Sequence, residues 1–164
     1  MKNDLSRRLQ EVLLDGKWIA NTNFKEQLTQ THWKMAKTKI GNLNSIALLT
    51  FHVNYYLKGL LPVFEGGALE IKDKFSFDMP EIYSESDWLN LVNEFLSHAE
   101  KFILKVEQLN ENLLDQAFVK EEYGTYSRNI EAQIEHCYYH LGQLVLLKKL
   151  FSQKQLEGLT EFDE

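Results

Sequence analysis

Long helical periods with few interruptions constrain the fold of this chain more than any other feature of its sequence. Only two prolines, Pro62 and Pro80, and eight glycines occur in 164 residues, so few positions interrupt regular backbone hydrogen bonding. Between residues 88 and 109, apolar side chains recur at intervals of three and four, the spacing of one helix face. This pattern predicts an amphipathic helix that begins at Ser84, where Asp87 stands at capping-box spacing.

Three other segments have the length and the period of long helices. Their apolar residues follow helical spacing, and residues suited to capping or to ending a helix stand at their ends. We expect these helices over residues 2–14, from Asn44 or Ser45 to about Phe64, and from near Tyr126 to about Phe151. A short helix is also expected over residues 24–28, with Thr22 or Asn23 as its cap.

The second and third long helices are separated by residues 65–84, called the crossover below, which show no helical period. A connection of this length is uncommon in a compact domain, and it is long enough to let the two helices run parallel. Residues 68–77 are expected to form a short hairpin-like excursion. The chain is therefore predicted to be an all-α four-helix bundle with a long crossover between helices 2 and 3. We expect one domain over residues 1–164, with a solvated acidic tail at residues 157–164.

Charge and hydropathy exclude several classes of protein. The net charge of −6 argues against a nucleic-acid partner, which requires clustered positive charge. No apolar run approaches the roughly 18 residues that cross a bilayer, and the N-terminus lacks the apolar region of a signal peptide. We therefore expect a cytoplasmic protein without a membrane partner. Cys137 is the only cysteine, which excludes an intrachain disulfide and suggests an inert core thiol.

The last predicted helix contains a pair of histidines four residues apart, His136 and His140. Side chains at this spacing lie on one side of a helix, so two imidazoles can converge on one metal ion. Gln133 and Gln143 share their stripe, which flanks the apolar face instead of lying in it. A polar row beside a core stripe is typical of an internal polar site or of an exposed face, and the pattern alone does not distinguish them.

His52 favours the internal site. It lies in the predicted second helix, whose apolar residues cover nearly every side, so its side chain should be buried. It is also roughly 12 Å from the start of that helix, at a depth similar to the mid-helix positions of the histidine pair. We therefore predict a metal site formed by His52, His136 and His140. The alternative is that these histidines are core residues bonded to backbone carbonyls.

Four polar neighbours are candidates to orient these ligands or a substrate, and each also fits a purely structural role: Gln133, Gln143, Tyr55 and Tyr56. We expect His98 to be solvated on the charged side of the third helix. His32 has no partner at ligand spacing. The H-E-x-x-H motif of metalloproteases requires Glu after the first His, where Cys137 stands, so no general base or other catalytic residue is assigned.

These segments resemble the DinB-like superfamily of metalloenzymes, which are four-helix bundles with one His on the second helix and an H-x-x-x-H pair on the fourth. HCYYHLGQL, residues 136–144, resembles the fourth-helix signature, in which Y-H-x-G-Q follows a first His. NSIALLTFHVNYYL resembles the second-helix segment, and GKWIANTNFKEQL the lead-in of one subgroup. The resemblance covers nearly the whole chain, including the crossover. Leu141 stands where many relatives carry a basic residue, which argues against anion binding at that position.

Three neutral imidazoles suit a divalent transition metal, zinc or nickel first, and leave open positions on the ion. The resemblance implies transfer of a low-molecular-weight thiol to a small electrophile, while the residues also allow hydrolysis by a metal-activated water. A non-catalytic metal-binding or dimerisation bundle is the third possibility. The resemblance also implies a homodimer, for which Trp18, Trp33, Phe75 and Phe77 offer apolar surface, unless these aromatics cap the bundle's own core.

Overall fold

The computed structural model describes residues 2–156, so the acidic tail expected at residues 157–164 lies outside the described residues. Within residues 2–156 there is no strand beyond one isolated bridge between Ala117 and Thr125. The helices are α1 (Lys2–Gln10), α2 (Phe24–Thr29), α3 (Trp33–Lys37), α4 (Ile46–Phe64), α5 (Glu85–Gln108) and α6 (Tyr126–Leu156). A π-helical segment, Glu11–Asp15, continues α1, and single 3-10 turns lie at Asp73–Phe75, Glu111–Leu113 and Glu121–Tyr123.

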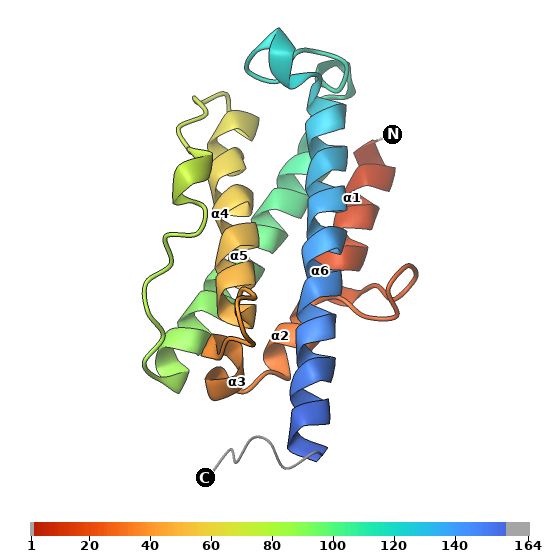
Figure 1. The fold of residues 1–164 in the computed structure, drawn as a ribbon. Helices are drawn as coiled ribbons and strands as arrows, with labels where there is room; N and C mark the ends of the chain where they lie inside the picture. The colour runs from red at the N-terminus through yellow and green to blue at the C-terminus, as the bar shows by residue number, and fades with distance from the viewer. Residues whose placement is uncertain (1, 157–164) are drawn as a thin grey trace.

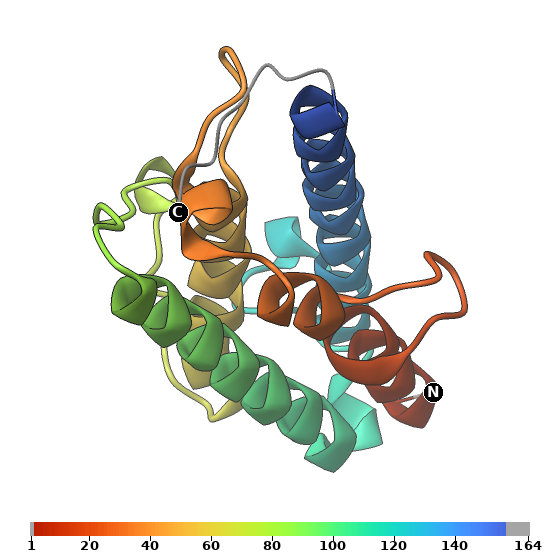
Figure 2. The same ribbon diagram turned by 90° about the horizontal axis from the view of Figure 1, so that it is seen from below.

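Four long helices form the bundle: α1 with its π-helical continuation, α4, α5 and α6. In Figure 1, α4 and α5 run in the same direction, and the crossover returns along the outside of α4 from the end of one helix to the start of the next. Viewed from below in Figure 2, the four helices surround a common interior, with α5 between α1 and α4. The prediction of an all-α four-helix bundle with a long crossover is confirmed.

Side-chain caps fix where several helices begin. The Ser45 hydroxyl accepts a hydrogen bond from the Leu48 amide at 3.2 Å, so α4 starts at one of the two predicted caps. Ser84 and Asp87 form a reciprocal capping box at the start of α5, and Asn23 caps α2. Each such cap stabilises its helix by about 1 kcal/mol. Three of the predicted starts therefore follow from local chemistry that the sequence already contains.

The expected hairpin-like excursion at residues 68–77 is wrong. The crossover has no strand there: residues 68–72 are irregular, and a 3-10 turn at Asp73–Phe75 continues into a turn at residues 76–77. Its backbone pairs with a side chain instead of a second strand, because the Tyr55 hydroxyl donates to the Lys72 carbonyl at 2.9 Å and accepts from the Lys72 amide at 3.0 Å. A tyrosine of α4 thus satisfies the polar groups that a hairpin partner would have satisfied.

The lower end of the bundle in Figure 1 is closed by two short helices, α2 and α3, and α3 was not predicted. Phe24 of α2 is fully buried, with its ring centroid 5.1 Å from that of Phe95 on α5. The Trp88 indole donates to the carbonyl of Thr31 at 2.9 Å. Five residues are too few to display a helical period, which explains why the sequence pattern missed α3.

No described helix has both the length and the apolar character that a membrane span requires.

Candidate metal centre

His52 on α4 and His136 and His140 on α6, called the histidine cluster below, meet where these two helices pack together. One nitrogen atom of each ring lies within 4.8 Å of those of the other two. The Nε2 atoms of His52 and His136 are 3.0 Å apart. Two nitrogen ligands about 2.0–2.1 Å from one ion are separated by about 2.8–3.4 Å when the angle at the metal is between right and tetrahedral. The structure brings together all three histidines that the sequence singled out, close enough that they could hold one ion, and the His52–His136 pair already has the spacing of two ligands.

Hydrogen bonds to carbonyl oxygens orient two of the three rings. The His52 Nδ1 lies 3.3 Å from the backbone oxygen of Ser76, and the His140 Nδ1 lies 2.7 Å from the Gln143 Oε1. A carbonyl oxygen only accepts hydrogen bonds, so Nδ1 carries the proton in each ring. The Nε2 atom of both rings is then unprotonated and presents a lone pair, as a metal ligand requires.

The crossover supplies one wall of the histidine cluster. The Phe77 ring stacks on the His52 ring with centroids 4.0 Å apart and an interplanar angle of 12°. The Tyr56 ring meets the rings of His52 and His136 edge-on, at 5.2 Å from each, and its hydroxyl donates to the Asp73 Oδ1 at 3.1 Å. Sequence reasoning missed Asp73 and Ser76 and assigned Phe77 to a dimer surface, because the crossover has no period that relates its residues to a helix face.

A close approach between α4 and the crossover holds this wall in place. The side chain of Ile71 occupies the space where a Cβ atom at Gly59 would lie, so any larger residue at position 59 would push the two segments apart. The Tyr55 hydroxyl holds the next residue, Lys72, by its backbone. Tyr55 therefore turns to the crossover and not to the histidine cluster, whereas Tyr56 contacts both.

Burial lowers the pKa of all three imidazoles of the histidine cluster. The effect is largest at His136, whose pKa falls to about 4 because burial and the neighbouring His140 and His52 rings all disfavour a positive charge there. The histidine cluster is therefore neutral near pH 7. Neutral imidazoles bind a cation without first losing a proton from a charged ring.

The glutamines and the cysteine on this part of α6 have distinct surroundings. Gln143 contacts His140 as described above, but Gln133 is 3.6 Å from the Cys137 sulfur and bonds to no histidine. Cys137 is fully buried, which raises the pKa of its thiol to about 12. It therefore stays protonated in the core and is suited neither to nucleophilic attack nor to metal coordination.

The two remaining histidines lie elsewhere. His98 was expected to be solvated, which is wrong: it is half-buried between α5 and α4, with its Nδ1 atom 2.8 Å from the Asn54 Oδ1. Because Asn54 is itself buried, the pair satisfies a polar group inside the bundle. His32 is exposed and caps α3 by accepting from the Lys34 amide at 3.3 Å. Neither histidine belongs to the group that can hold a metal.

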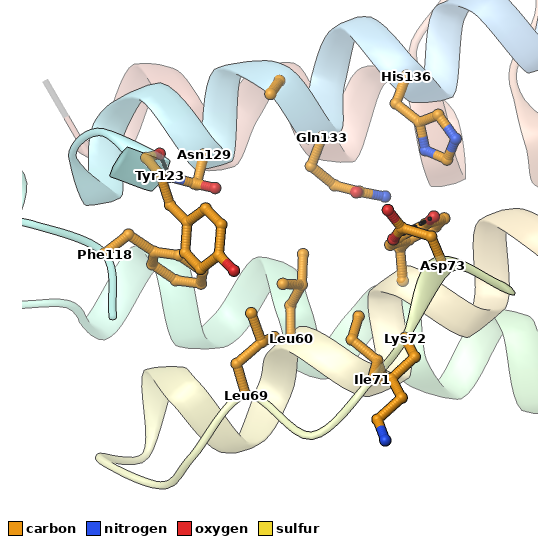
Figure 3. Close-up of a pocket in the computed structure, with 12 residues that line it drawn as sticks. Leu60, Leu69, Ile71, Lys72, Asp73, Phe118, Tyr123, Asn129, Gln133 and His136 are labelled. Atoms are coloured by element: carbon orange, nitrogen blue, oxygen red, sulfur yellow. Dashed lines mark hydrogen bonds between the residues drawn. The ribbon is translucent and has the colours of Figure 1, made fainter. Parts of the chain in front are cut away.

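A cavity of about 490 Å³ opens beside His136 (Figure 3). Its walls come from α4, the crossover, the 3-10 region before α6, and α6 itself. His136, Gln133 and Asp73 lie at one end, and Leu69 and Phe118 lie toward the other. The histidine cluster is thus adjacent to a space large enough for a small molecule.

Fold and site together define an all-α bundle with a three-histidine cluster, able to hold a metal ion, between its second and fourth long helices. The chain belongs to the family described as "Protein of unknown function (DUF1572)", whose model matches residues 7–161. DUF1572 is a DinB-like family, in agreement with the resemblance of the sequence motifs. No curated protein and no solved structure matches the chain.

Proposed function

We propose that this chain binds one divalent transition-metal ion, zinc or nickel, through the Nε2 atoms of His52, His136 and His140, and that it acts on a small molecule beside that ion. The proposal depends on the convergence of one nitrogen atom from each of the three rings, with the Nδ1 atoms of His52 and His140 already bonded to carbonyl oxygens. One such hydrogen bond satisfies a buried histidine that has only a structural role. Three imidazoles in mutual contact bring together ring nitrogens that a purely structural role does not require.

The reaction that we propose is transfer of a low-molecular-weight thiol to a small electrophile. A divalent ion held by three neutral imidazoles supplies a Lewis acid whose open positions favour an anion such as a thiolate. A thiol, with a pKa of about 8.5, ionises far more readily than water and needs no strong general base. This suits the described cavity lining, where Asp73 is the one carboxylate and already accepts a hydrogen bond from Tyr56.

Residues around the histidine cluster would limit the access of water and position the second substrate in such a reaction. Phe77 covers one face of His52 and, with the Tyr56 ring, limits the access of water to the histidine cluster from the crossover side. The cavity gives the second substrate a place next to His136. In the transfer, the sulfur forms a bond to the electrophilic carbon, the leaving group departs with its electron pair, and the thiol proton passes to solvent.

Metal content tests the first half of the proposal. Purified untagged protein should hold about one transition-metal ion per chain by elemental analysis, and the His136→Ala/His140→Ala variant should hold almost none. His32→Asn is the matched control, because it removes a histidine outside the histidine cluster and keeps a side chain able to cap α3. An equal metal content in the double variant would contradict the proposal.

Activity tests the second half. Metal-loaded protein should couple one or more small thiols to 1-chloro-2,4-dinitrobenzene, and the double variant should not. Hydrolysis of ester substrates, with no thiol transfer, would indicate the hydrolase instead. Stoichiometric metal without turnover of thiols or esters would indicate a non-catalytic bundle in which the ion stabilises the fold.

A further inference from the structure

We propose that the cavity beside His136 binds a small amine or amide with an apolar body, whose N–H groups donate to Asp73 and Gln133. The inference rests on the proposed function for the reaction that such a ligand would undergo, but not for the binding itself. It names a substrate class that neither the family nor the metal chemistry specifies.

The first feature that indicates a ligand is the poorly satisfied side-chain amide of Gln133. The residue is only 4 % exposed, and its Nε2 atom has the Cys137 sulfur at 3.6 Å as partner. Sulfur is a weak acceptor, and across residues 2–156 the structure gives this amide no other hydrogen bond. A buried amide is normally satisfied by strong partners. Figure 3 shows the end of Gln133 turned to the polar end of the cavity, so a ligand there can complete its hydrogen bonding.

The negative charge at the polar end of the cavity, beside His136, favours a ligand that donates hydrogen bonds. The Asp73 Oδ1 accepts from the Tyr56 hydroxyl, and its second oxygen is available to a ligand. In Figure 3 the Asp73 carboxylate points toward Gln133 and His136, whereas the Lys72 amine extends away from them. The polar end therefore presents a carboxylate without a compensating cation. An amine or amide N–H is attracted there, and a carboxylate ligand is repelled.

The rest of the cavity is largely apolar. Leu60, Leu69 and Phe118 contribute to its wall, with Tyr123 and Asn129 beside Phe118 (Figure 3). Phe118 is held by edge-on packing against Tyr126 with ring centroids 5.0 Å apart. The volume of about 490 Å³ lies within the range of small-molecule sites, about 300–1,000 Å³. The body of the ligand should therefore be aromatic or branched aliphatic, with its nitrogen directed toward the histidine cluster.

The test uses two probes of similar size and opposite charge, 2-phenylethylamine and 3-phenylpropanoate, titrated calorimetrically at pH 7 into chelator-treated full-length protein. The amine should bind, and the carboxylate should bind at least about tenfold more weakly, the effect of one charged hydrogen bond. Equal binding of both probes, or no binding of the amine, would overturn the inference.

Variants locate the site. Asp73→Asn should weaken amine binding about tenfold, whereas Asp78→Asn, on the same crossover but outside the cavity, should leave it unchanged. Ala132→Phe fills the cavity from α6 and should abolish binding, with Ser152→Phe, exposed on the same helix, as its control. If Ala132→Phe does not fold, Leu69→Trp fills the same space from the crossover. A folded cavity-filling variant that binds the amine as the wild type does would contradict the inference.

Metal analysis of the same preparations separates the two proposals. Amine binding by a protein that takes up no metal would uphold the cavity site and refute the metal centre. A protein that takes up one metal ion per chain but does not bind the amine would refute the cavity site alone.

Discussion

The Nε2 atoms of His52 and His136 face each other at 3.0 Å across the contact between α4 and α6, although 84 residues separate them in the sequence. The Ser76 carbonyl keeps the proton of His52 on Nδ1, so the Nε2 atom of His52 is an acceptor. The space between the two nitrogen atoms therefore suits either a proton held by His136 or a metal ion. With His140 beside both rings, this relationship makes the histidine cluster a candidate metal centre instead of a set of unrelated core residues.

Gln143 should set the metal affinity through His140. Replacing it with Leu removes the acceptor 2.7 Å from the His140 Nδ1, so the ring loses its fixed orientation. We expect the variant to bind zinc about 10–100-fold more weakly in competition with a chromophoric chelator. Gln153→Leu is the control, since Gln153 is exposed on the same helix away from the histidine cluster. Unchanged affinity in Gln143→Leu would show that this hydrogen bond does not support a metal ligand.

Phe77 and Phe75 form a natural pair for testing the crossover. Both are 44 % exposed, but only Phe77 stacks on His52, while Phe75 lies under the Lys74 ammonium. Because a stacked ring pair contributes about 0.5–1.5 kcal/mol, Phe77→Ala should weaken zinc binding by roughly two- to tenfold. Phe75→Ala should leave zinc affinity unchanged. Similar losses in both variants would mean that the crossover acts through general stability and not through His52.

The metal-free protein should lose stability on acidification. The pKa of His136 is about 4 in the folded state and 6.5 without burial, so between these values the unfolded state binds more protons. The free energy of unfolding should therefore fall as the pH decreases from 6.5 to 4, by roughly 2–3 kcal/mol, and should not change on this account above 6.5. Urea denaturation across this pH range, with chelator present, measures this decrease in the free energy of unfolding.

The His136→Gln variant is the comparison for that titration. It lacks the titrating ring, so its unfolding free energy should decline less than that of the wild type between pH 6.5 and 4. Identical declines would place the acid sensitivity elsewhere in the protein.

The homodimer stays a prediction. Trp33 packs against the core, as the alternative interpretation held, but Trp18 is 85 % exposed. Sedimentation velocity at micromolar concentration should show a dimer, and Trp18→Ser should shift it toward the monomer. Leu104→Ser, at an exposed position of α5, should not. A wild-type protein that sediments only as a monomer would exclude the dimer.

Local chemistry explains what the sequence predicted well. The helical periods, the Ser45 and Ser84 caps, and the i, i+4 pair on α6 depend on neighbouring residues, so they can be read without knowing the tertiary fold. The meeting of His52 with the α6 pair was anticipated from matching depth along the two helices. That inference was correct because residues near the middle of two long helices lie at the same level of a bundle, whichever way the helices run.

The remaining features depend on long-range contacts with an irregular segment. Nothing in the pattern of the crossover shows that Ser76 accepts from His52 or that Asp73 meets Tyr56, because extended segments have no fixed register against a helix. The same lack of long-range information explains why His98 was wrongly expected to be solvated. Its neighbours in the sequence are charged, but its partner Asn54 comes from another helix.

Anomalous diffraction from crystals grown with zinc would locate the bound ion itself. We predict one zinc peak per chain, about 2.0–2.1 Å from the Nε2 atoms of His52, His136 and His140. Data collected on both sides of the zinc absorption edge would identify the element. An ordered map in which these three rings surround no anomalous peak, or in which zinc binds elsewhere on the chain, would contradict it.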